Sequence, residues 1–314
     1  MWDLASAAAV QRFGLVVVYH GVFEEPPEEL RGNLHNVPPE AFAAQISWID
    51  KHFEIVTLDD FMAADWVAGK AVITFDDAYI CVFENAVPLL RARGLPFTVF
   101  INGRTLEGRP FWRDKIRCLI NHGLVKDFIA FREHYNGLSD SVQASGFYRS
   151  SKAPGVNSRR LDEELDAFVE SRKGSLTFDA LSHHIARPSD LIAEEGVTYG
   201  NHGYSHYVMS SLDRAEQKEE IERNQALLAS LNLPLTRTFA FPFGGARDFT
   251  TTTIELLRAT GYSGGLYSRN RLNQASREGQ FLAERFMPSA DMGQFHKRLL
   301  MAFYRTLRPS SIDG

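Results

Sequence analysis

The 314-residue chain contains only two cysteines, Cys81 and Cys118, which lie far apart in the sequence. Their scarcity and separation argue against a disulfide framework and against a C-x-x-C zinc site. No apolar run approaches the ~20 residues that a membrane-spanning helix needs. The first residues, MWDLASAAAVQRF, lack the basic start and long apolar stretch of a signal peptide. We therefore expect a cytoplasmic protein without an integral membrane segment.

The chain also lacks a strong charge of either sign. It has 34 Lys and Arg against 39 Asp and Glu, a net charge of -5, which gives no general attraction for nucleic acid. Internal repeats and low-complexity tracts are absent from the sequence. Hydrophobic residues make up 44% of the chain, an ordinary globular composition that suits one large α/β barrel. Composition alone leaves the oligomeric state open.

What the sequence does contain is an alternation of short apolar runs with amphipathic segments, the pattern of repeated βα units. The runs predicted to be strands are residues 14–19, 71–75, 96–101, 197–200, 238–241 and 262–267. Helical spacing is expected in several of the intervening segments, and Asp213 with Glu216 forms a capping box for a helix that runs to about residue 231.

Residues 104–195 interrupt this alternation. They are polar and partly helical, with helical spacing over residues 111–131 and 161–168. We interpret this segment as a lid or subdomain inserted into a single domain that spans residues 1–314.

Three polar clusters directly follow predicted strands: Asp76-Asp77, residues 202–206 (HGYSH) and residues 242–245 (PFGG). In α/β barrels the carboxyl ends of the strands converge on one face, where active sites are built. Two adjacent carboxylates at the end of a buried strand are costly unless a cation or hydrogen-bond donors meet them. The alternative is that one of the two aspartates caps the following helix.

His202 and His206 are spaced so that both imidazoles can meet on one side of a turn, as paired ligands of a transition metal do. The alternative is two surface histidines. One Asp with these two His would leave metal positions open, which is the layout of a catalytic site. The second Asp would then be placed to accept a proton from water.

Three segments resemble, in order, the first three motifs of the polysaccharide deacetylase family, also called the NodB-homology family or carbohydrate esterase family four. These are TFDDA (74–78), NHGYSH (201–206) and FAFPFG (239–244). The resemblance covers most of the chain outside the insertion. It implies a distorted (β/α) barrel of fewer than eight strands. It also implies a metal-dependent hydrolase that removes an N-acetyl group from an amino-sugar-containing glycan or glycan precursor.

By the same resemblance, Asp76 is the expected catalytic base, and Asp77, His202 and His206 are the expected ligands of one divalent transition metal, Zn²⁺ being the expected ion. The Phe243 N–H is the expected donor to the oxyanion.

The chain departs from the family pattern at two points. Ala240 stands where the third motif usually has an Arg that orients the catalytic Asp. Arg285, in the segment LAERFMP, is a candidate to supply that charge, the alternative being an ordinary surface arginine. Residues 19–21 (YHG) and 284–288 (ERFMP) resemble a branch of the family that modifies bacterial exopolysaccharides and surface glycans.

The usual histidine general acid of the last motif is also missing. His20 ends the first predicted strand and is a candidate to bind substrate or to protonate the leaving amine. The alternative is a histidine that is hydrogen-bonded at the barrel rim. Within the insertion, Phe111-Trp112 either stacks against a sugar ring or anchors the insertion through hydrophobic packing.

Two other functions remain compatible with these residues. The same scaffold can support hydrolysis of a formamide, a cyclic amide or an O-acetyl ester, because each reaction passes through a similar tetrahedral intermediate. A catalytically degenerate carbohydrate-binding protein is the alternative of another class.

Overall fold

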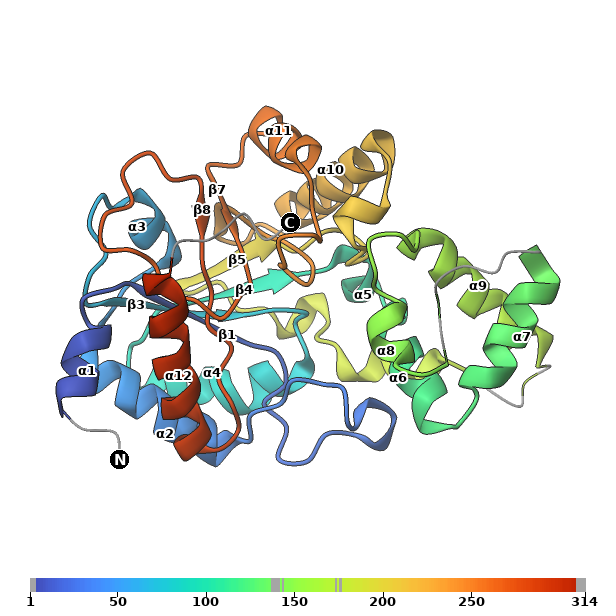
Figure 1. The fold of residues 1–314 in the computed structure, drawn as a ribbon, viewed down its shortest axis with the longest axis horizontal. Helices are drawn as coiled ribbons and strands as arrows, with labels where there is room; N and C mark the ends of the chain where they lie inside the picture. Colours follow the sequence, from blue (N-terminus) through green and yellow to red (C-terminus); the bar gives the residue numbers. More distant parts are fainter. Residues whose placement is uncertain (1–3, 137–141, 143, 173, 175–176, 309–314) are drawn as a thin grey trace.

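The computed structural model describes residues 4–136, 142, 144–172, 174 and 177–308. Its centre is one sheet in which seven parallel strands follow the order β1-β3-β4-β5-β6-β7-β8 (Figure 1). These strands are β1 (Leu15–Tyr19), β3 (Lys70–Phe75), β4 (Phe97–Ile101), β5 (Val197–Asn201), β6 (Leu235–Ala240), β7 (Gly264–Leu266) and β8 (Leu282–Ala283). The two-residue strand β2 (Glu54–Ile55) pairs with β3 outside this path.

The two ends of the path meet. Val17 of β1 forms a parallel bridge with Phe286, which follows β8. Backbone hydrogen bonds run from Val18 N–H to the Phe286 carbonyl and from Phe286 N–H to the Val16 carbonyl. The predicted distorted barrel, with fewer than eight strands in its wall, is confirmed.

The strands that begin and end close to their predicted bounds are those buried along their length. Every residue of β1 and β4 is buried, and such strands read as continuous apolar runs. Strand β6 begins three residues before the predicted start because its first half alternates, with Leu235 and Arg237 exposed and Thr236 buried. An apolar run therefore marks only the second half of β6.

Helices flank the barrel wall, as expected for βα units. They are α1 (Leu4–Val10), α2 (Pro39–His52), α3 (Leu58–Ala63), α4 (Val87–Ala92), α5 (Gly103–Leu106), α10 (Arg214–Ser230), α11 (Thr251–Ala259) and α12 (Met292–Leu307). The predicted capping box of α10 is present, with reciprocal hydrogen bonds between Asp213 and Glu216. Among the described helices, none combines the length and apolar character required to cross a bilayer.

Between β4 and β5 the described chain forms helices instead of strands. Helices α6 (Trp112–Asn121), α7 (Val125–Asn136), α8 (Phe147–Ser150) and α9 (Ser158–Ser171) lie together at one end of the molecule (Figure 1). The helical spacing predicted over residues 111–131 is confirmed by α6 and most of α7, and the chain turns between these two helices at Gly123, whose φ is 69°. A hydrophobic cluster joins these helices to Tyr79 and Tyr207, which follow β3 and β5. A lid function for this segment remains a prediction.

Candidate active site

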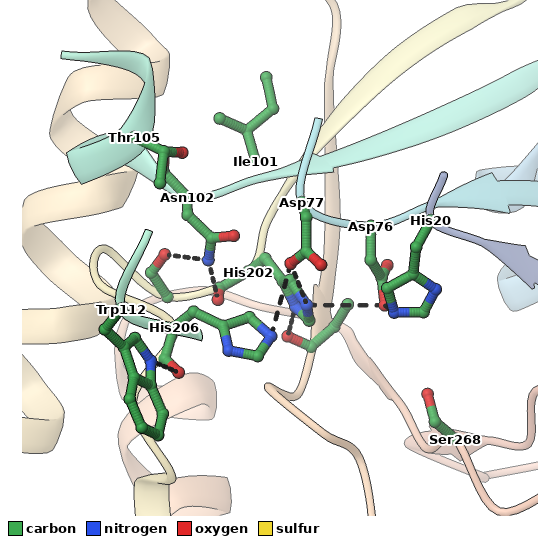
Figure 2. A network of polar contacts seen from close by, with 12 residues as sticks. His20, Asp76, Asp77, Ile101, Asn102, Thr105, Trp112, His202, His206 and Ser268 are labelled. Atoms are coloured by element: carbon green, nitrogen blue, oxygen red, sulfur yellow. Dashed lines mark hydrogen bonds and ion pairs between the residues drawn. The ribbon is translucent and has the colours of Figure 1, made fainter. Parts of the chain in front are cut away.

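The site lies where the carboxyl ends of the parallel strands converge. Six of the seven predicted site residues line one cavity of about 220 Å³, and the seventh, Arg285, contacts Asp76. The six are His20, Asp76, Asp77, His202, His206 and Phe243. Figure 2 shows His20, the two aspartates and the two histidines turned toward one another. The six cavity residues come from segments that follow β1, β3, β5 and β6, so the fold assembles them from distant parts of the sequence.

Asp77, His202 and His206 form a compact, buried trio. Their potential ligand atoms all lie within 4.8 Å of one another. Asp77 Oδ1 is 3.5 Å from His206 Nε2 and 3.7 Å from His202 Nε2. These distances are too long for hydrogen bonds of ordinary strength, and they leave room for an ion between the three side chains.

The free atoms of the trio suit a metal ion. His202 Nδ1 donates a hydrogen bond to the Ala240 carbonyl at 2.8 Å, which fixes the tautomer and leaves the Nε2 lone pair free. His202 Nε2 and Asp77 Oδ1 are buried and have no hydrogen-bond partner among the described residues. Burial lowers the pKa of His202 and of His206, so both imidazoles are neutral, which is the form that binds metals.

The electrostatics of Asp77 also favour a cation. Burial and the neighbouring charge of Asp76 raise the pKa of Asp77 well above its ordinary value. A buried carboxylate with a free oxygen is unfavourable unless a positive charge compensates it, and a divalent ion would do so. The residues present therefore fit a divalent metal ion held by one carboxylate and two imidazoles.

The backbone at the site adopts unusual conformations. Asp77, His206 and Phe243 have positive φ values of 69°, 60° and 64°. Non-glycine residues rarely adopt this left-handed region, and such strain concentrates at functional sites. The surrounding structure must therefore stabilise these three residues.

Neighbouring side chains hold the histidine loop in place. The Asn102 amide donates to the His202 and Gly203 carbonyls at 2.7 and 3.0 Å, and the Trp112 indole donates to the His206 carbonyl at 3.0 Å (Figure 2). The Glu220 carboxylate accepts from the Ser205 N–H. Trp112 is only 1% exposed and does not line the cavity, which favours the predicted anchoring over stacking against a sugar for this residue, whereas Phe111 lines the cavity.

Asp76 is paired with Arg285. The guanidinium donates from Nη1 to Asp76 Oδ1 at 2.7 Å and from Nη2 to Oδ2 at 2.8 Å. The remaining donors of Arg285 bind the Tyr267 carbonyl and the Ser268 hydroxyl. Burial alone would raise the pKa of Asp76, but Arg285, together with His202 and His20, lowers it to about 2. The alternative of a surface arginine is contradicted, because Arg285 is completely buried.

His20 is also close to Asp76, with its Nε2 4.0 Å from Asp76 Oδ2. His35 Nε2 lies 2.6 Å from the Pro288 carbonyl and must donate to it, so Nδ1 of a neutral His35 is an acceptor. His20 Nδ1, 3.3 Å from His35 Nδ1, is then the donor, and the His20 Nε2 lone pair faces Asp76. Burial lowers the pKa of His20 well below its ordinary value despite the attraction of Asp76. His35 has no motif around it, and sequence reasoning missed it.

Phe243 lies beside the trio, its ring centroid 4.7 Å from that of His206. No described residue accepts a hydrogen bond from the Phe243 N–H. Gly244 also has a positive φ, and a Cβ at this position would lie only 2.6 Å from the Ser268 nitrogen. The Phe-Gly pair therefore forms a tight turn that requires glycine at its second position.

Comparisons with known proteins agree with this geometry. The polysaccharide deacetylase family model matches residues 67–125 and 159–265, more than half of the chain. The curated Bacillus subtilis (strain 168) protein YxkH is 23% identical over 145 residues, which cover 44% of this chain. The match spans only 50% of the length of that relative.

Solved structures share the fold. A de-N-acetylase from Aggregatibacter actinomycetemcomitans has a TM-score of 0.56 at 12% identity, with 91% of this chain and 98% of that chain covered. IcaB from Ammonifex degensii has a TM-score of 0.52 at 19% identity, with 93% and 97% covered. The Streptococcus pyogenes deacetylase PplD, solved in complex with acetate, has a TM-score of 0.52 at 14% identity, with 95% and 99% covered.

At these identities the structural matches show the fold alone, whereas the family model matches the segments that carry the two aspartates and the two histidines. The chain therefore belongs to the polysaccharide deacetylase family.

Proposed function

We propose that this protein is a metal-dependent hydrolase that removes an N-acetyl group from an amino-sugar-containing glycan or glycan precursor. The observation that carries the proposal is the contrast between two adjacent carboxylates. Asp77 has a free buried oxygen facing two neutral histidines, whereas Asp76 is held ionised by a bidentate arginine. A ligand and a general base need these two different environments.

Asp77, His202 and His206 would hold the metal ion, with Zn²⁺ the expected one. When bound there, a divalent ion supplies Lewis-acid polarisation of water and of the acyl carbonyl. The Asp76 carboxylate accepts the proton of the attacking water, and Arg285 keeps that carboxylate ionised and oriented. The Phe243 N–H donates to the oxygen on which negative charge develops.

His20 is the proposed carrier of the proton to the leaving amine. Its Nε2 lone pair faces Asp76 and can take up the proton that Asp76 received from water. The resulting imidazolium then donates this proton to the amine nitrogen as the C–N bond breaks. His35 fixes the tautomer that this transfer requires.

The substrate assignment rests on the family and on the names of structural neighbours, among which are a de-N-acetylase and a deacetylase in complex with acetate. A degenerate binding protein is disfavoured, because Arg285 supplies the positive charge that Ala240 lacks and binds the Asp76 carboxylate. Formamide, cyclic amide and O-acetyl substrates remain alternative outcomes of the substrate test.

The direct experiment is to measure acetate release from N-acetylglucosamine oligosaccharides by the purified protein loaded with Zn²⁺. We expect turnover that disappears after chelation and returns when metal is added back. A parallel panel of formylated amines, cyclic amides and O-acetyl esters identifies the bond that is cleaved. Saturable glycan binding without hydrolysis of any member of the panel would instead support the degenerate binding protein.

A further inference from the structure

One wall of the active-site cavity is cationic. Arg113 and Arg117 of α6 and Lys152, which follows α8, line the same cavity as His202 and His206. The whole chain carries a net charge of -5, so this local excess of positive charge is not a consequence of composition. All three cations come from the segment between β4 and β5.

Two of these cations have no carboxylate partner among the described residues. Arg117 is neutralised by Asp114, but Arg113 binds only uncharged groups, donating to the Ser151 hydroxyl at 2.9 Å and to the Tyr148 carbonyl at 2.8 Å. Arg113 is 1% exposed, and its Nε has no acceptor. A buried guanidinium without a counter-charge is unfavourable, which indicates that an anion completes the arrangement.

Lys152 is the cation best placed to meet such an anion. Its ammonium forms no hydrogen bond or ion pair with any described residue and lies 4.8 Å from the centroid of the Phe243 ring. Phe243 in turn contacts His206, so Lys152 is close to the metal-binding trio. Burial and repulsion from Arg113 lower the pKa of Lys152, and the attraction of Tyr148 and of the Asp248 carboxylate only partly opposes this.

Part of the cationic wall lies outside the segments that the family model matches. The family model leaves residues 126–158 unmatched, and this interval contributes Tyr148 and Lys152 to the cavity. The metal-binding and base residues lie in the matched segments. Of the three cations, Lys152 therefore lies outside the matched segments, whereas Arg113 and Arg117 lie within them.

We propose that Arg113, Arg117 and Lys152 form a subsite for a negatively charged substituent, a carboxylate or a phosphate ester, carried by the substrate next to its acylated amine. This inference rests on the proposed function and narrows the substrate to anionic amino sugars. Lys152 makes the direct contact as a point charge, and the buried Arg113 adds to the positive potential around it, whereas Asp114 balances the charge of Arg117.

The test compares acetate release from three probes: a neutral N-acetylglucosamine oligosaccharide, N-acetylglucosamine 1-phosphate, and an oligosaccharide of N-acetylglucosamine and glucuronic acid. We expect higher kcat/KM for one of the anionic probes, and the preferred probe distinguishes phosphate from carboxylate. In Lys152→Met the ratio of kcat/KM for that probe over the neutral one should fall by about 10–100-fold, the value of a charged hydrogen bond. Lys152→Arg should restore most of the ratio.

Arg149→Met is the matched control, because Arg149 is an exposed cation of α8 that does not line the cavity. It removes the same charge and should leave the ratio as in the unmodified protein. Equal loss on neutral and anionic probes in Lys152→Met would show that the lysine acts on the reaction itself and would overturn the subsite. A wild-type preference for the neutral probe would do the same.

Failure of the proposed function is separable from failure of the subsite. If no probe releases acetate, binding of inorganic phosphate and of glucuronate to the metal-loaded protein is measured by calorimetry. Binding that is lost in Lys152→Met and retained in Arg149→Met supports the subsite without hydrolysis. Equal binding of both anions by all three proteins would overturn it.

Discussion

Asp76 and Asp77 are neighbours in the chain with opposite electrostatic surroundings. Arg285, together with His202 and His20, lowers the pKa of Asp76 to about 2 against the effect of burial, whereas burial and Asp76 itself raise the pKa of Asp77. Asp76→Asn should therefore keep the metal and lose on the order of 10²–10⁴-fold in kcat, the range for a general base. Asp77→Asn should lose metal affinity itself. Metal analysis and kcat, measured on both variants, check the assignment, and the reverse pattern would exchange the two roles.

Arg285 offers a second prediction at the scale of the residue. In Arg285→Lys an ammonium cannot reproduce the two parallel hydrogen bonds to Asp76, so kcat should fall by about 10–100-fold while metal content stays normal. Because the guanidinium lowers the pKa of Asp76, weakening it raises that pKa. Asp76 should then become protonated at a higher pH as the solution is acidified. The acidic limb of the pH–rate profile should therefore move to higher pH. Unchanged kinetics in Arg285→Ala would remove Arg285 from the site.

Site residues were predictable where local sequence marks them. Asp76, Asp77 and His202 follow buried apolar strands, and Arg285 was suggested by the missing Arg at Ala240. Asn102 and His35 were not predictable, because their importance comes from contacts with the His202 carbonyl and with His20 that only the folded chain creates. The positive φ value of Phe243 is likewise fixed by tertiary structure, since a Phe side chain does not favour the left-handed region.

At the scale of elements, continuous apolar runs in the sequence locate the buried strands well. The shortest strands contain no such run and are predicted poorly. β2 and β8 have two residues each, too few for any periodicity to appear. Strand β8 nevertheless positions Arg285, which lies just after it. A functionally important strand is therefore among those that the local sequence pattern predicts least well. The segment between β4 and β5 could be recognised as helical, but its positive charges near the site could not be placed without the fold.

The loop after β5 is the element whose position depends most on its neighbours. Trp112→Phe keeps the ring packing but removes the hydrogen bond to the His206 carbonyl, at a cost of about 1 kcal/mol. Metal affinity should fall by about tenfold, as for other residues that orient a ligand. Competition with a chromogenic chelator measures this change. Trp66→Phe, at a tryptophan that is 63% exposed, is the control and should bind metal as the parent does.

At the scale of the whole molecule, metal binding should stabilise the fold. The trio joins residues that follow β3 and β5, and an unfolded chain has no such preformed site. At a free Zn²⁺ concentration of 100 times Kd, the unfolding free energy should rise by about 2.7 kcal/mol. Thermal denaturation with and without metal measures this as a higher Tm. The His202→Ala/His206→Ala double variant should show no such increase, and full metal occupancy in it would refute the ligand assignment.

The ion pair between Asp76 and Arg285 joins residues 209 positions apart, across the bridge at which Phe286 meets β1. A chain emerging from the ribosome presents its amino-terminal part first. Asp77, His202 and His206 are thus all available long before the guanidinium arrives. Under the proposed function, a nascent chain that ends before Arg285 contains all three ligand residues but lacks the group that keeps Asp76 charged. Under that function, hydrolysis requires that residues up to Arg285 have been synthesised and that the last strand has closed the barrel.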